Sequence, residues 1–106
     1  MEHIINITQT IEQVDDRDWQ VKMEIESEGG STFTEFNYTD TNGIFPLYNS
    51  LINTIRQFKD VHINLTTSNQ VFVKEVNGSA GKNSRLLQIL NETKQEKGVT
   101  IDAYTK

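Results

Sequence analysis

Carboxylates are the reactive side chains that this sequence offers most often, and two groups of them have spacings that could hold a cation. Segment 14–18 (VDDRD) contains three aspartates, and Glu24, Glu26 and Glu28 follow at alternate positions. A calcium loop also needs a glycine at its sharp turn and a distal glutamate, and segment 14–18 lacks both. Carboxylates at alternate positions of a strand share one face, which is usually solvated. Both groups are therefore interpreted as surface charges.

The remaining reactive side chains are few and scattered. His3 and His62 are the only histidines, and their spacing does not suggest a metal pair, so His62 is interpreted as a surface or partly packed residue of a strand. The chain contains no cysteine, and no serine stands in a G-x-S-x-G context. Asp102 could act as an acid but makes no site alone. The sequence therefore predicts no metal site and no cofactor.

The charge is distributed unevenly along the chain. Residues 1–53 carry two basic and ten acidic side chains, a net charge of −8, whereas residues 54–106 carry eight basic and five acidic ones, a net charge of +3. An acidic surface repels a phosphate backbone, while a basic face can still attract one. The overall charge of −5 argues against a dedicated nucleic-acid binder, and the second half keeps that alternative open.

The elements that must position these residues are organised around segment 61–78 (VHINLTTSNQVFVKEVNG). Val61, Ile63 and Leu65 alternate with polar residues, which predicts a half-buried strand. Three hydroxyl residues follow, and segment 71–76 then has apolar residues at helical spacing before an Asn-Gly stop. The stretch therefore predicts a strand, a polar turn and a short helix.

Three strands are predicted before this stretch, at 4–11, 19–26 and 32–39. The second shows the clearest alternation of apolar and charged residues, and Glu28–Ser31 is typical of a hairpin turn. Because their connections are short, the three strands should form an antiparallel meander.

Helices and one further strand complete the pattern. Pro46 fits the first turn of an amphipathic helix that continues to about Phe58. A later helix, capped by Asn83 or Ser84, precedes a last strand at 99–104. The order is β-β-β-α-β-α-α-β, and strands joined through helices should lie parallel. We therefore expect one α/β domain over residues 1–106, with a five-stranded mixed sheet flanked by helices.

This order and several local strings resemble the ribonuclease H-like superfamily, in particular its small bacterial and reverse-transcriptase-like branch. The strings are similar to that family's "TNN..E..", "I.TDS" and "v.evnG…KN..L..L" patterns. In this sequence they are Thr41–Gly43 with Leu47–Tyr48, Ile63–Ser68, and Val73–Gly78 with Lys82–Asn83 and Leu86–Leu87. The resemblance covers nearly the whole chain and implies the ribonuclease H-like fold.

The resemblance also identifies residues where the family's carboxylates would stand. The family cleaves RNA strands with two metal ions held by converging carboxylates. This chain has Thr67 at the acid of the "TDS" motif, Pro46 or Leu47 at the glutamate of the first helix, and Gln9 or Thr10 at the aspartate of the first strand. The chain also ends after the last strand, so we expect a terminal helix with a further acid to be absent. These departures predict a degenerate member without catalytic residues, which is not an enzyme.

Two functional hypotheses follow. The first is a catalytically inactive ribonuclease H-like accessory module for protein binding or regulation, including self-association through its acidic and basic halves. The second is a non-cleaving binder of RNA or RNA–DNA hybrid. The net acidity favours the first. The candidate phosphate-binding residues of the second are Lys74, Lys82, Arg85, Lys94 and Lys97.

Location and origin rest on weaker signals. The N-terminus lacks the basic and apolar regions of a signal peptide, and no segment has the apolar length of a membrane span. We therefore expect a cytoplasmic protein without membrane contact. The composition, rich in Asn and Thr and free of Cys, suits a small accessory protein of a low-GC bacterium or its phage.

Overall fold

A computed structural model describes residues 3–78 and 83–106 of the chain. Its elements follow the predicted order β-β-β-α-β-α-α-β. They are β1 (His3–Asp15), β2 (Asp18–Ser27), β3 (Gly30–Tyr38), α1 (Phe45–Ile55), β4 (Val61–Thr67), α2 (Gln70–Asn77), α3 (Ser84–Lys97) and β5 (Thr100–Thr105).

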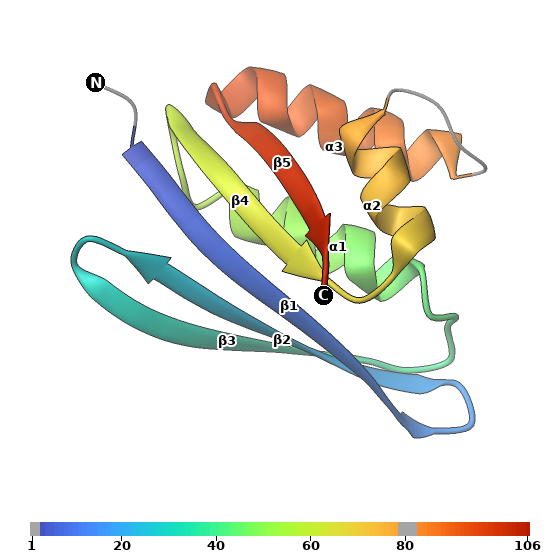
Figure 1. The fold of residues 1–106 in the computed structure, drawn as a ribbon. Helices are drawn as coiled ribbons and strands as arrows, with labels where there is room; N and C mark the ends of the chain where they lie inside the picture. The colour runs from blue at the N-terminus through green and yellow to red at the C-terminus, as the bar shows by residue number, and fades with distance from the viewer. Residues whose placement is uncertain (1–2, 79–82) are drawn as a thin grey trace.

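The strands form one mixed sheet in the order β3-β2-β1-β4-β5 (Figure 1). β1, β2 and β3 pair antiparallel as consecutive hairpins, whereas β4 pairs parallel to β1 and β5 pairs parallel to β4. Each parallel strand is reached through helices, as the pattern of elements predicted. The predicted fold class, an α/β arrangement with a five-stranded mixed sheet, is confirmed.

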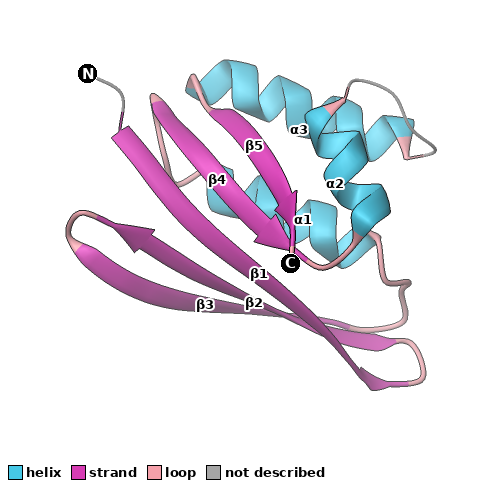
Figure 2. Ribbon diagram, in the orientation of Figure 1, coloured by secondary structure: helices cyan, strands magenta, loops and turns pink. Residues whose placement is uncertain are grey.

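The three helices lie on one side of the sheet (Figure 2), and we call the opposite side the open face. The burial pattern of β1 shows why, because Ile5, Ile7 and Gln9 are buried while their neighbours Ile4 and Asn6 are exposed. The same alternation runs through β2 and β4. The sheet therefore has one apolar side toward the helices and one polar side toward solvent.

The core forms between the sheet and α1, with α2 and α3 closing its edges. Leu47, Leu51 and Ile55 of α1 are fully buried, as their shared helical face predicted. Tyr48 packs edge-to-face on Phe72 of α2, with 4.8 Å between the ring centroids. Burying each of these large side chains stabilises the fold by about 1.5–3 kcal/mol relative to exposure.

The start of α1 and the end of α3 are fixed by local chemistry. The Asn42 side-chain oxygen accepts hydrogen bonds from the backbone N–H groups of Ile44 and Phe45, both at 2.9 Å, which satisfies donors that the first helical turn leaves free. At the other end of the helical layer, Gly98 follows α3 with a φ of 66°, a left-handed conformation that glycine adopts without strain. A Cβ at this position would also collide with the Asp60 carboxylate.

β1 is longer than predicted. The expected strand ended at residue 11, but pairing with β2 continues to Asp15, which lies opposite Asp18, with an irregularity between Gln13 and Asp15. Backbone hydrogen bonds to β2 extend this polar part of the strand, and no apolar pattern marked it in the sequence. The acidic run therefore belongs to the tip of a hairpin, where Arg17 Nε donates a 2.8 Å hydrogen bond to Asp40.

Candidate functional site

A cluster of buried, uncharged polar groups joins the sheet to the start of α1, where the resemblance placed the family's carboxylates. Gln9 of β1 is fully buried, and its Nε2 donates to the Leu47 carbonyl at 3.1 Å and to Ser50 Oγ at 3.0 Å. Its Oε1 accepts a 2.9 Å hydrogen bond from Thr67 Oγ1 at the end of β4. Because β1 and β4 are parallel and adjacent, these two residues meet below α1. We call Gln9, Leu47, Ser50 and Thr67 the neutral cluster.

The structure shows where the alternative residues of the first strand and the first helix lie. Gln9, not Thr10, points toward the helices, because Thr10 lies on the open face, where Lys106 Nζ donates to its hydroxyl at 3.2 Å. In α1, Leu47 contributes a carbonyl to the cluster. Ser50 was not identified from the sequence. Its position three residues after Leu47, inside the apolar stripe of the helix, was the signal that could have found it.

A second polar cluster, which contains a buried carboxylate, lies where the three helices meet. Glu75 of α2 is 4% exposed, and Tyr48 Oη donates to its Oε1 at 2.5 Å. Asn83, just before α3, donates from Nδ2 to the same carboxylate at 3.1 Å. We call Tyr48, Glu75 and Asn83 the charged cluster. Burial, together with the bond to Glu75 and its charge, raises the pKa of Tyr48 above its ordinary value, so this hydroxyl stays protonated and donates.

The charged cluster was also missed in the sequence. Glu75 follows Phe72 by three positions, so the two residues share the buried face of a short helix. A carboxylate is rarely fully buried without partners, so this placement needed donors from elsewhere in the chain. Asn83, which was expected to cap α3, makes no side-chain cap and bonds Glu75 instead.

The structure divides the predicted phosphate-binding residues among several places. Lys74 of α2 and Arg85 in the first turn of α3 are both exposed, and each lies within two residues in sequence of a member of the charged cluster. Lys94 lies about half a helical turn around α3 from Arg85, at 100° per residue, so the two point to opposite sides of the helix. Burial lowers the pKa of Lys94, and the charge of Asp102 acts in the opposite direction.

Lys97 lies apart from the junction of α2 and α3. Lys97 is in the last turn of α3, about 18 Å along the helix from Arg85. Lys82 lies outside the described residues. Among the described candidates, Lys74 and Arg85 are therefore exposed, and the two lysines further along α3 are half-buried.

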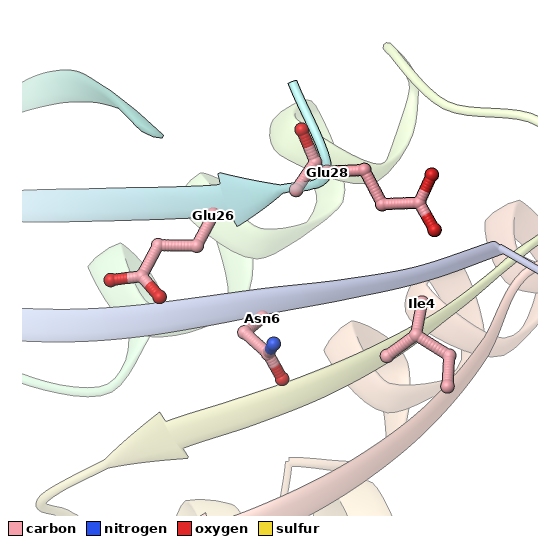
Figure 3. Close-up of a pocket in the computed structure, with 5 residues that line it drawn as sticks. Ile4, Asn6, Glu26 and Glu28 are labelled. Atoms are coloured by element: carbon pink, nitrogen blue, oxygen red, sulfur yellow. The ribbon is translucent and has the colours of Figure 1, made fainter. Parts of the chain in front are cut away.

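The open face carries the glutamates that had a spacing compatible with a cation. A hollow of about 380 Å³ there is lined by Ile4, Asn6, Glu26, Ser27 and Glu28. Figure 3 shows that the carboxylates of Glu26 and Glu28 point away from each other. A hydrogen bond with Glu26 raises the pKa of Glu24, burial and like charge add to this, and Lys106 opposes it. In residues 3–78 and 83–106, no three His, Cys, Asp or Glu side chains gather in a metal-binding arrangement.

His62 also lies on the open face, bound by residues of β5. Its Nε2 is 3.1 Å from Asp102 Oδ2, and its Nδ1 is 2.6 Å from Thr100 Oγ1. The imidazole is 19% exposed, as expected for a partly packed strand residue. Within the part of the chain that the structure describes, no helix is long and apolar enough to cross a membrane.

Comparison with known proteins identifies solved structures that have a similar fold. No protein-family model matches the chain, and no curated protein matches it. Among solved structures, LC11-RNase H1, isolated from compost by a metagenomic approach, matches with a TM-score of 0.74 and 13% identity over 98% of this chain and 86% of that one. Its complex with an RNA/DNA hybrid matches with a TM-score of 0.74 and 11% identity over 96% and 86%. The N-terminal RNase H domain of Mycobacterium tuberculosis rv2228c matches at 0.73 and 5% identity over 99% and 84%.

These neighbours contradict the prediction that the chain is not an enzyme. The prediction rested on neutral residues in separate strings, among them Gln9 and Thr67, and treated the identity of those side chains as decisive. The neighbours are ribonuclease H1 structures, and their fold extends over nearly the whole chain. Isolated strings also could not show which polar groups the folded chain brings together from β1, α1 and β4. The resemblance itself is confirmed: the chain has the fold of the ribonuclease H-like superfamily.

Proposed function

We propose that this chain is a nucleic-acid-binding module and that its ligand is an RNA–DNA hybrid. The observation that carries the proposal is the match, over 96% of the chain, to a ribonuclease H1 structure solved in complex with such a hybrid. The ligand is taken from that neighbour, whereas the contact residues proposed below come from the charges of this chain.

The charges of the described residues support a contact near the junction of α2 and α3. Lys74 and Arg85 are exposed there, while the acidic residues concentrate in the first half of the chain. α2 and α3 lie on the helical side of the sheet, opposite the open face that carries Glu24 and Glu26 (Figure 2). Because binding of this kind releases counterions from the phosphate backbone, affinity should fall steeply with salt.

A titration of the full chain with fluorescently labelled hybrid tests the proposal. We expect saturable binding at low salt in the presence of EDTA, which keeps the hybrid intact and makes binding the only readout. The double variant Lys74→Ala/Arg85→Ala should weaken binding and reduce the slope of log affinity against log salt by about two, because each removed cation neutralised one phosphate.

A matched variant separates local contact from net charge. Arg56→Ala/Lys59→Ala removes the same two charges from exposed positions after α1, so it should change the salt slope much less. If the wild-type chain does not bind hybrid at low salt, or if the two double variants weaken binding equally, the proposed interface is wrong.

Protein binding is the second candidate function, and one observation favours it. β3 is an edge strand of the sheet and carries Phe33, whose side chain is 70% exposed. A large exposed aromatic residue on a free strand edge is typical of an association surface. The cytoplasmic location and the bacterial or phage origin stay predictions.

A further inference from the structure

The two edges of the sheet differ in how their backbone groups are satisfied. At β5, the Asn77 side chain from the end of α2 bonds the backbone of Ala103 twice. Its Oδ1 accepts from the Ala103 N–H, and its Nδ2 donates to the Ala103 carbonyl, both at 2.8 Å. One amide side chain thus takes the place that a neighbouring strand would occupy. α2 also packs along β5, so this edge is closed.

The edge at β3 has no such cover in the described part of the chain. β3 is nine residues long and pairs with β2 alone, in a register without a bulge from Gly30 opposite Ser27 to Tyr38 opposite Trp19. It contains no lysine and no proline, the residues that commonly keep edge strands from pairing. Its outer backbone groups are therefore arranged to accept another strand.

Side-chain packing leaves the first half of β3 free as well. The second half is held by α1, because Tyr38 Oη donates to Asn49 at 2.9 Å and the Tyr38 ring packs edge-to-face on Phe45. Thr32 and Phe33 of the first half are exposed, and Gly30 has open space where a Cβ would be. A partner strand could therefore approach this half of β3 without displacing a helix.

We propose that a second copy of this chain pairs with β3 in an antiparallel arrangement about a two-fold axis at Phe33. The two sheets then form one continuous sheet, with both Phe33 rings packed together on the open face. This inference concerns self-association and is independent of hybrid binding. It also places the contact at a strand edge, whereas the charge distribution had suggested contact between acidic and basic halves.

The side chains of β3 select this register. With Phe33 opposite itself, Ser31 faces the partner's Glu35, and Gly30 faces the partner's Phe36, whose ring can cover the exposed glycine backbone. A shift by one residue in each strand, with Thr34 on the axis, would place Phe33 against a glutamate. A further shift would place Glu35 opposite itself, and like charges directly opposite destabilise a strand pair.

Sedimentation equilibrium of the full chain tests the proposal. The apparent mass should rise from 12.2 kDa toward twice that value as the concentration increases. Phe33→Lys should keep the chain monomeric, because it places two ammonium groups against each other at the axis. Tyr104→Lys is the matched control, since Tyr104 is 51% exposed on the closed edge strand β5, and it should leave the association unchanged. A chain that stays monomeric at about 1 mM, or equal effects of the two variants, would overturn the proposal.

Cysteine cross-linking tests the register, because the chain contains no cysteine of its own. A mixture of Ser31→Cys and Glu35→Cys chains should form disulfide-linked heterodimers under mild oxidation. Either variant alone should form much less disulfide-linked dimer than the mixture, because the two equivalent cysteines of such a dimer would lie too far apart to bond. Equal cross-linking of the single variants and the mixture would contradict pairing centred on Phe33.

Discussion

The neutral and charged clusters both anchor α1, but they use different physics. The neutral cluster ties the helix to β1 and β4 through an amide, two hydroxyls and a carbonyl. The charged cluster ties the same helix to α2 and to the residue before α3 through one carboxylate. Neighbouring residues of α1, Leu47 and Tyr48, belong to different clusters. The neutral cluster thus contains no ionising side chain, whereas the contact of α1 with the other helices depends on a buried charge.

The largest effect should come from removing the carboxylate. Glu75→Ala leaves the buried Tyr48 hydroxyl and the half-buried Asn83 amide without this acceptor, and we expect the free energy of unfolding to fall by about 3 kcal/mol. Urea denaturation measures this change. Glu96→Ala removes an exposed carboxylate from α3 and should change stability by less than about 0.5 kcal/mol. Equal effects would show that the charged cluster contributes nothing specific.

A smaller loss is expected at the neutral cluster. Gln9→Leu keeps the size of the side chain but leaves the Thr67 and Ser50 hydroxyls without their amide partner. We expect the free energy of unfolding to fall by about 2 kcal/mol. Gln95→Leu, at an exposed position of α3, is the matched control. A loss as large as that of Glu75→Ala would mean that the buried charge does not distinguish the two clusters.

The smallest loss of stability should appear only in alkaline solution, where a tyrosine of the charged cluster can ionise and the neutral cluster cannot. Burial raises the pKa of Tyr38 to about 12, and the pKa of Tyr48 is also raised, whereas the unfolded chain loses tyrosine protons near pH 10. The native state then binds more protons than the unfolded state above pH 10, so its stability should decrease as the pH rises toward 12.

Phenylalanine variants show which tyrosine causes this loss of stability at alkaline pH. Tyr48→Phe and Tyr38→Phe should each flatten the decrease in melting temperature between pH 10 and 12. Gln9→Leu should lower the melting temperature by the same amount across that range, because the neutral cluster contains no ionising side chain. A profile that none of the tyrosine variants alters would contradict the assignment.

Much of the fold was predictable because its signals are local and periodic. The alternation that starts at Trp19 and the helical spacing after Pro46 each reflect one buried face, and both elements form there. α1 ends at Ile55, however, before the expected end at about Phe58. The extension of β1 beyond residue 11 was not predictable, since its polar residues are held by pairing with β2. The candidate site was less accessible still. Ser50 and Glu75 are polar residues inside apolar stripes, and their hydrogen-bond partners lie up to 41 positions away in sequence.

The Asn77 amide on β5 has a consequence for how large an assembly of this chain can grow. A molecule with two available edges can join a neighbour on each side, and such chains of contacts have no natural end. Here one edge is already occupied by the molecule's own side chain. The proposed pairing through β3 would use the other edge of the described sheet in each copy, so association through sheet edges would stop at two and would not continue into a fibre.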